Sequence, residues 1–429
     1  MPPSIRSTAS YLLLIQGSNY LFPLVLLPFL GHKLGVREFG VLAYCQALAQ
    51  YLILLTDYGH NLSATRVVSL RRDDPAAIAE VFSATMLAKL LLLLGAALLM
   101  GAALLGLPDL REHWTILAAA FVGVFANAVT PIWLYQGLEK MKTLVLPNFI
   151  SKAASLACVM LWVRSPGDAA WAALGISMGT AILAVAALWG VIRGRLAGLV
   201  RVSWAAVMGS LRDGFPMFLS LVLVSFYVNF NALLLNHFHG PVAVGQFSMA
   251  DKIRIAGQTI FTVLGTAFYP RISQYNVSNP AAARALMRRA MIVVFACSCS
   301  MFVFVEIFAG MGIRMWLGEP FHDAILLLRL EAVLLPLTSV AFIFGNLGLM
   351  ALGHHRTVRN IYAAVTLLHL IYVVPFVLYM GAEGTVISVI LTELAGAVAF
   401  YLCYRRATTG GSSPAPRTRE SPTVKEMQV

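Results

Sequence analysis

Nine ionisable side chains lie inside long apolar segments of this chain. A charge at the centre of a bilayer costs at least about 2.5–3.5 kcal/mol on insertion scales. Lipid-facing positions are therefore unfavourable, and we expect these side chains to face a wet cavity or one another. They are five bases, Lys89, Lys152, Lys252, Arg254 and Arg329, and four acids, Asp251, Glu306, Glu331 and Glu393.

The bases are suited to binding an anion such as a phosphate. Lysine meets a phosphate as a point charge, and arginine meets it as a fork of donors. The N-terminal half contains Lys89 and Lys152 but no carboxylate near the middle of a span. We therefore expect a cationic cavity. The competing interpretation is structural pairing, of Asp251 with Arg254 or Lys252 and of Glu331 with Arg329.

Polar side chains, both neutral and charged, recur on the same helix faces. Asn148, Lys152 and Ser155 are spaced i, i+4 and i+7, which places them on one face of a helix. A second face carries Asp251, Arg254, Gln258 and Thr262. The remaining candidates for a polar lining are amides in other spans: Asn19, Gln46, Asn229 and Asn231.

Three of the acids are candidates for coupling transport to an ion: Asp251, Glu306 and Glu393. Glu393 and His369 lie near the middle of their spans, where either could relay a proton. A satisfied interior role explains both at least as well. Asp57, at the inner end of its span, is expected to cap a helix or to pair locally.

The elements that position these side chains are membrane-spanning helices. The chain has 429 residues, 59% hydrophobic and 12% charged, and its mean hydropathy is +0.80. A bilayer core needs roughly 20 apolar residues per helix. We predict an all-α membrane protein with twelve spans, at 9–30, 37–58, 76–106, 113–136, 143–163, 169–192, 216–237, 242–269, 286–312, 322–351, 358–380 and 383–404. The third, eighth and tenth are long enough to predict tilt or a break.

Basic residues are distributed unevenly between the two sides of this bundle. With the N-terminus in the cytoplasm, 21 of the 31 Lys and Arg residues fall in inner loops and termini. Five fall in outer loops and five within spans. Cytoplasmic loops carry the excess of Lys and Arg in membrane proteins. We therefore expect both termini to be cytoplasmic.

Two related halves are indicated by matching outer loops. LGVREFGVLAY at 34–44 and HGPVAVGQFSM at 239–249 place Gly35 and Gly40 opposite Gly240 and Gly245, 205 residues apart. Internal repeats are typical of transporters whose substrate path lies between the repeats. We expect two pseudo-repeated six-helix bundles and two further segments: the bundles at 1–192 and 216–404, an amphipathic cytoplasmic linker at 193–215, and a disordered tail at 405–429.

Other kinds of site are not indicated. The five cysteines all lie in apolar stretches without the spacing of a zinc or redox site. We find no catalytic arrangement, metal cluster or phosphate-binding glycine loop, so we expect no enzyme activity, metal or cofactor. The net charge of +12 is explained by the inner loops and predicts no nucleic-acid partner.

Five motifs in order resemble the Wzx-type bacterial polysaccharide and O-antigen flippases, in the superfamily that also contains multidrug antiporters and the lipid II flippase. The motifs are distributed across most of residues 9–273: TDYGHNLSATR at 56–66, WLYQGLEKMK at 133–142, NALLLN at 231–236, GQFSMADKIRIA at 245–256 and FYPRIS at 268–273. The last four spans resemble the family only in hydropathy.

The resemblance implies transport of an undecaprenyl-diphosphate-linked oligosaccharide across the cytoplasmic membrane. Two bundles would rock around a central cavity, with membrane lipid around them and a polymerase and glycosyltransferases in the same pathway. Lys89, Lys152, Lys252 and Arg254 would attract the pyrophosphate or acidic sugars, and amide side chains would meet hydroxyls. Arg66 is a further head-group candidate, although an ordinary positive-inside residue is the simpler interpretation.

Three alternatives remain. An ion-coupled multidrug or small-molecule antiporter of the same superfamily should carry acidic clusters in its N-terminal half, which are missing here. A membrane-embedded glycosyltransferase or polymerase should carry a sizeable loop outside the bilayer, whereas the longest connector is only the 193–215 segment. A scaffold without transport activity does not explain nine charges within the spans.

Overall fold

The structure is a computed structural model that describes the backbone of residues 5–409. Within that range it describes all side chains except those of residues 5–21, 23, 24, 224, 227, 228 and 277. The side chain of Asn19 and residues 410–429 of the predicted tail therefore lie outside the described part of the chain.

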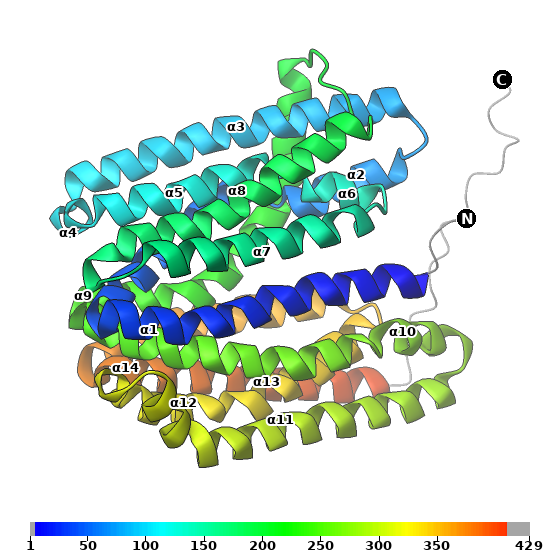
Figure 1. Cartoon of the computed structure of the whole chain (residues 1–429). Coiled ribbons are helices and arrows are strands. Elements are labelled where there is room, and N and C mark those ends of the chain that lie inside the picture. Colours follow the sequence, from blue (N-terminus) through cyan, green and yellow to red (C-terminus); the bar gives the residue numbers. More distant parts are fainter. Residues whose placement is uncertain (1–4, 410–429) are drawn as a thin grey trace, which may run out of the picture.

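The described chain is helical and contains no strand, which confirms the predicted all-α class (Figure 1). Nine of its helices are long and apolar enough to cross a membrane. Eight of the nine overlap the long helices α1 (Ile5–Asp57), α3 (Pro75–Gly106), α5 (Trp114–Val129), α7 (Lys142–Trp162), α8 (Ala169–Arg193), α9 (Trp204–Thr266), α11 (Pro280–Trp316) and α14 (His355–Thr409). The ninth, Asp323–Met350, is irregular and is described below. Shorter elements connect them: α2 (His60–Leu70), α4 (Pro108–Glu112), α6 (Ile132–Gly137), η1 (Pro166–Asp168), α10 (Tyr269–Ser278) and η2 (Glu319–Phe321).

Three long helices bend sharply at a glycine with positive φ. Gly35 divides α1 (φ 70°), Gly240 divides α9 (φ 77°) and Gly381 divides α14 (φ 59°). Glycine adopts this left-handed region without the steric cost that a Cβ imposes. Each of the three helices thus supplies two arms, and the twelve predicted spans are consistent with this arrangement.

The three bends lie at one end of the molecule, which we call the elbow end. A Cβ on Gly40, five residues after the first bend, would overlap the backbone at Pro241, next to the second bend. A Cβ on Gly381 would lie 3.5 Å from the ring of His239. The elbow end therefore brings together segments that are far apart in the sequence.

The helices form two layers with α1 and α9 between them (Figure 1). One layer contains α3, α5, α7 and α8, and the other contains α11 to α14. The contact between α1 and α9 is the most extensive of any two elements. Relative movement of the two layers must therefore change the packing of α1 on α9.

The tenth predicted span is broken, as its length suggested. It consists of α12 (Asp323–Ala332), α13 (Leu334–Phe342) and the π-helical segment η3 (Ile343–Met350). The third predicted span instead forms one uninterrupted helix, α3. A π-helical turn changes the direction of the side chains that follow it, and such turns are frequent at functional sites.

The predicted linker is helical in its second half. Residues 194–203 are irregular, and the backbone N–H of Val200 donates to Ser83 Oγ at 2.8 Å. Helix α9 then begins after Ser203, whose hydroxyl accepts from the N–H of Ala206 at 3.2 Å. The helix continues to the bend at Gly240 without a break at the predicted boundary of 215 and 216.

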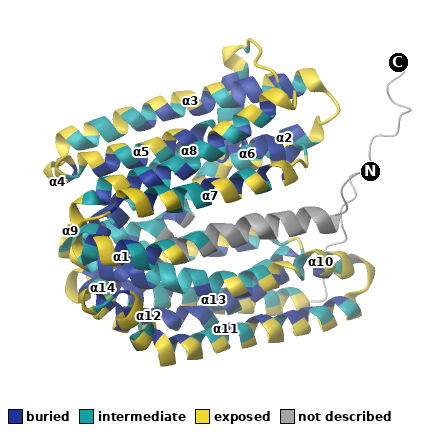
Figure 2. Ribbon diagram, viewed as in Figure 1, coloured by how far each residue is buried: buried dark blue, intermediate teal, exposed yellow. Residues whose placement is uncertain are grey.

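Exposed residues lie along the outward faces of the helices (Figure 2), and many of them are large and apolar. On α3, Leu98 is 66% exposed, and on α11, Met315 is 70% exposed. Water would penalise such surfaces, whereas lipid tails solvate them. The chain is a multi-pass membrane protein.

Candidate functional site

A polar cavity lies between α9 and the helices α12, α13 and α14. Its volume is about 410 Å³, and its wall includes Asp251, Arg254 and Gln258 from α9 together with Glu331 from α12. The four-residue polar stripe predicted on α9 reaches this cavity, because Thr262 also lines it. The sequence pattern therefore identified one wall of the cavity correctly.

Arg254 lies between two carboxylates in this cavity. One of its terminal nitrogens donates to Asp251 Oδ1 at 2.5 Å, and its Nε lies 3.5 Å from Glu331 Oε2. Another terminal nitrogen donates to Gln258 Oε1. Arg254 is thus held by neighbouring acids, and this limits its attraction for an incoming anion.

Glu331 is the most deeply buried acid of this group. The residue is 1% exposed, and neither of its carboxylate oxygens accepts a hydrogen bond from a described residue. The predicted pairing of Glu331 with Arg329 is wrong, because Arg329 instead lies 4.0 Å from Glu306. Residues two apart on a helix point in different directions and do not meet.

His369 has a partner at each ring nitrogen. Its Nδ1 lies 2.8 Å from Thr392 Oγ1, and its Nε2 lies 3.0 Å from Asn231 Oδ1. Tyr372 also hydrogen-bonds to Thr392. The imidazole is fully buried, so this geometry favours the satisfied interior role over an open proton relay.

Lys89 is placed differently from its predicted position in a cavity. It is 1% exposed, and its Nζ lies 3.4 Å from Asp57 Oδ1. The pairing partner expected for Asp57 is therefore supplied by the neighbouring helix α3. A buried, paired lysine cannot also bind substrate without breaking this ion pair, so we remove Lys89 from the candidate cavity residues.

Helix α1 ends at Asp57, and the turn that follows it lies within the first motif shared with the family. Tyr58 (φ 48°) and Gly59 (φ 77°) both adopt left-handed conformations between α1 and α2. A Cβ on Gly59 would lie 2.6 Å from Met217 Cβ, and the Tyr58 ring stacks on Phe218 at 4.6 Å. The motif TDYGHN thus forms a bend that packs tightly on α9.

Lys152 and Lys252 remain available for an anionic ligand. Both are partly buried, Lys152 on α7 and Lys252 on α9. Among the described residues, no carboxylate oxygen lies within 4.0 Å of either Nζ. Neither ammonium group is therefore in an ion pair with a described carboxylate, although Asp251 directly precedes Lys252 in the chain and attracts its charge.

The other predicted site residues do not converge on one place. Asn148 is buried on α7, and a Cβ on Gly179 of α8 would press on Ser155, so this polar face packs partly against α8. Asn229 donates to Ser225 Oγ at 3.2 Å. Gln46 is partly exposed, Arg66 is exposed on α2, and Glu393 lines the cavity that contains Arg254.

A second, larger cavity of about 1480 Å³ was not predicted. It lies at the elbow end between α11, α12 and α14, and its walls include Arg314, Arg329 and Glu383. These residues come from three separate segments, so no local spacing in the sequence could indicate that they share a wall.

A model of the family described as "Polysaccharide biosynthesis protein" matches residues 5–276. The chain belongs to this family. Two curated relatives of this chain carry the name "Putative O-antigen transporter". The one from Escherichia coli strain K12 is 29% identical over 91% of this chain and 94% of its own length. The one from Shigella dysenteriae is 30% identical over 89% of this chain and 96% of its own length.

Solved structures with the same fold include flippases and multidrug transporters. The lipid II flippase MurJ in an inward closed conformation overlaps with a TM-score of 0.75 at 14% identity, covering 92% of this chain and 87% of MurJ. An inward-facing multidrug MATE transporter overlaps with a TM-score of 0.74 at 16% identity, covering 91% and 95% of the two chains. An outward-facing MATE transporter gives 0.60 at 17% identity, with 94% of each chain covered.

Proposed function

We propose that this protein is a flippase that moves an oligosaccharide linked to undecaprenyl diphosphate across a bacterial cytoplasmic membrane. The observation that carries the proposal is the similarity to the Escherichia coli O-antigen relative along 91% of the chain. The family match over residues 5–276 and the fold shared with a lipid II flippase support it. Glycosyltransferases would build the lipid-linked oligosaccharide before this step, and a polymerase would extend it afterwards on the outer side.

The physical problem for such a flippase is the polar head group. A sugar chain and a pyrophosphate cannot cross hydrocarbon without partners for their polar groups, whereas the polyprenyl tail can remain in lipid. We assign attraction of the pyrophosphate to Lys152 and Lys252, because no described carboxylate oxygen lies within 4.0 Å of either ammonium nitrogen. The proposed cationic path would thus depend on two of the four bases expected from the sequence, and neither of them lines the cavity around Arg254.

The excess of basic residues in the loops opposite the bends assigns the elbow end to the outer face of the membrane. The overlap is greater with the inward-facing MATE transporter, 0.74, than with the outward-facing one, 0.60. Both comparisons support a state closed at the elbow end. The six-helix units 1–192 and 216–404 would rock apart there to release the head group.

Coupling to an ion is assigned to the cavity around Arg254. Asp251 and Glu331 both contact this arginine, and Glu393 lines the same cavity. Protonation of one carboxylate would change the net charge of a buried cluster, and buried charge is costly. Glu306 lies against Arg329 instead, which favours a structural role for it.

The first test is mass spectrometry of membrane lipids from a strain that lacks this protein. We expect a polyprenyl-diphosphate oligosaccharide to accumulate on the inner leaflet, where enzymes added from the cytoplasmic side can reach it. The accumulated lipid would also identify the sugar. An unchanged lipid pool with intact surface polysaccharide would contradict the proposal.

The second test removes the unpaired bases. We expect Lys152→Ala and Lys252→Ala to reduce complementation of that strain at least about tenfold, because each removes a contact of about 1.5 kcal/mol or more with a charged group. Lys140→Ala is the matched control, since Lys140 is exposed in a loop. Full complementation by Lys152→Ala, with normal insertion, would refute the assigned role.

The second candidate function is an ion-coupled multidrug or small-molecule antiporter. The observation that favours it is a fold overlap with a MATE transporter, 0.74, almost equal to that with the flippase, 0.75. The cavity that carries Asp251, Glu331 and Glu393 has the acidic excess that a cationic drug would need. Drug susceptibility of the deletion strain with an unchanged lipid pool would support this function instead.

A further inference from the structure

Two of the three bends at the elbow end, those at Gly35 and Gly240, are related by the internal repeat of the chain. Gly35 has φ 70° and ψ 174°, and Gly240 has φ 77° and ψ −178°, so the two bends share one conformation. Each bend is followed five residues later by another glycine, Gly40 in α1 and Gly245 in α9. The spacing of 205 residues is the same for both pairs.

The second glycine of each pair contacts the beginning of the opposite arm. A Cβ on Gly40 would lie 1.8 Å from the carbonyl oxygen of Pro241, and a Cβ on Gly245 would lie 2.2 Å from the carbonyl oxygen of Val36. Val36 and Pro241 each follow a bend directly. The contact is therefore reciprocal, with each arm placing its glycine against the other arm's first carbonyl.

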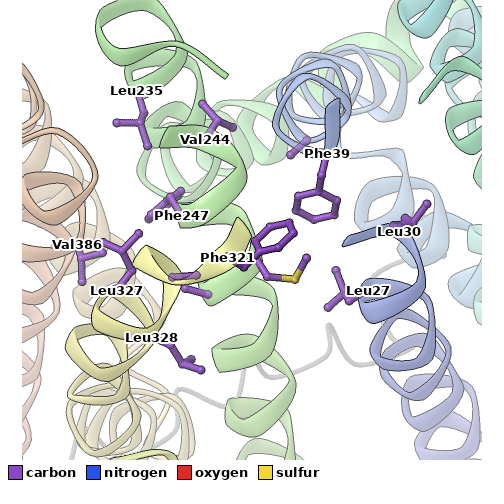
Figure 3. Close-up of a cluster of buried hydrophobic side chains, with 14 of the residues drawn as sticks. Leu27, Leu30, Phe39, Leu235, Val244, Phe247, Phe321, Leu327, Leu328 and Val386 are labelled. Atoms are coloured by element: carbon purple, nitrogen blue, oxygen red, sulfur yellow. The ribbon is translucent and has the colours of Figure 1, made fainter. Parts of the chain in front are cut away.

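Figure 3 shows a cluster of buried apolar side chains that includes Phe39 and Val244, the residues directly before Gly40 and Gly245. The rings of Phe39 from α1 and Phe321 from η2 meet edge to face, with centroids 6.0 Å apart. Both residues are at most 2% exposed. A Cβ on Gly31 would lie 2.7 Å from Leu317, so α1 also packs closely on the end of α11. Gly40 and Gly245 are themselves buried, whereas Val36 and Pro241 are partly exposed.

We propose that Gly40 and Gly245 form a backbone latch that holds the elbow end closed and separates each time the protein opens there. Small residues let helix backbones approach closely in membranes, where packing supplies much of the helix–helix attraction. Such packing falls off within a fraction of an ångström. It therefore holds the closed state firmly and releases it without breaking an ion pair.

This role rests on the proposed alternating movement of the two units, and it predicts a steric consequence. In Gly40→Ala the new Cβ must move from 1.8 Å to at least the 3.0 Å that real contacts require. The two arms must therefore separate by at least about 1.2 Å. Overpacking of this kind shifts the closed-to-open ratio by roughly five- to hundredfold.

The test measures access to the latch rather than transport. In a chain whose five cysteines are replaced by serine, Phe39→Cys is reacted with a membrane-impermeant maleimide, in intact cells and in inverted vesicles. We expect Gly40→Ala and Gly245→Ala to accelerate labelling from one side by roughly five- to hundredfold. Gly95→Ala is the matched control, because a Cβ there meets nothing within 4 Å. A cysteine at the buried Val124 must stay unlabelled throughout, which shows that the variants remain folded.

Equal labelling rates in the latch variants and in Gly95→Ala, with equal insertion, would overturn the proposal. Phe39→Cys combined with Phe321→Cys supplies a measurement with the native glycines. We expect oxidation to cross-link this pair and stop complementation, and reduction to restore it. No cross-link, or a cross-linked protein with full activity, contradicts the latch. A changed labelling rate together with an unchanged lipid pool would keep the latch and refute the flippase assignment.

Discussion

Substitutions in the ion pair between Lys89 and Asp57 test whether this intramembrane lysine has a structural role or a transport role. Its partners lie 3.4 Å apart, with side chains 2% and 12% exposed. At an effective dielectric constant of about 20, charges at that distance attract by about 5 kcal/mol. Removing one partner of a buried pair leaves the other charge uncompensated and costs about 3–5 kcal/mol. We expect Lys89→Met and Asp57→Leu each to destabilise the protein by that amount.

Replacing both partners should recover most of the loss, because a buried ion pair can often be exchanged for apolar residues with little net cost. The double variant Lys89→Met with Asp57→Leu should therefore unfold near the temperature of the parent. The measurement is thermal unfolding of detergent-solubilised protein, followed by tryptophan fluorescence. Lys140→Met, in an exposed loop, is the control and should leave the unfolding temperature unchanged.

The transport assay supplies the refuting result. If Lys89 serves stability, the double variant should complement the deletion strain nearly as well as the parent. A Lys89→Met protein that is as stable as the parent but inactive would refute the structural role. That result would return Lys89 to the substrate path.

Two further predictions concern single residues. Arg254→Ala should lower the unfolding temperature strongly, because it leaves the buried Glu331 carboxylate without its cation. Arg254→Lys should retain part of the stability, and thermal unfolding measures both variants. Gly35→Ala should destabilise by about 1–3 kcal/mol through its positive φ alone, since a Cβ there meets nothing within 4 Å. Gly95→Ala, in a regular helix with equal space, should be neutral or slightly stabilising, and equal unfolding temperatures for the two variants would contradict the backbone argument.

The pairing of charges shows where local spacing is informative. Asp251 and Arg254 are three residues apart and do form an ion pair, because residues at that spacing share a helix face. Arg329 and Glu331 are only two residues apart in the sequence, yet Arg329 pairs with Glu306 and Glu331 with Arg254. Partners on other helices follow from how the helices pack, and no local pattern records that.

The glycine pairs show the same division. Their equal spacing of 205 residues already indicated a repeat and placed both glycine pairs in matching outer loops. The sequence did not indicate that Gly40 and Gly245 would each meet a carbonyl of the opposite arm. That contact depends on two helix hairpins meeting, and a repeat in one chain does not specify how its halves face one another.

The sequence alone determined the helical class and the membrane environment, because the length of an apolar block is set by the thickness of the bilayer. Its twelve predicted spans are consistent with the bent helices of the structure. It also identified the family through five ordered motifs. Only the tertiary structure decided which charges form ion pairs: Lys89 pairs with Asp57 and Arg254 with two acids, while no described carboxylate oxygen lies within 4.0 Å of the Lys152 or Lys252 ammonium nitrogen. The energy of a charge depends on what lies within a few ångströms of it, and in a helix bundle those neighbours come from distant parts of the chain.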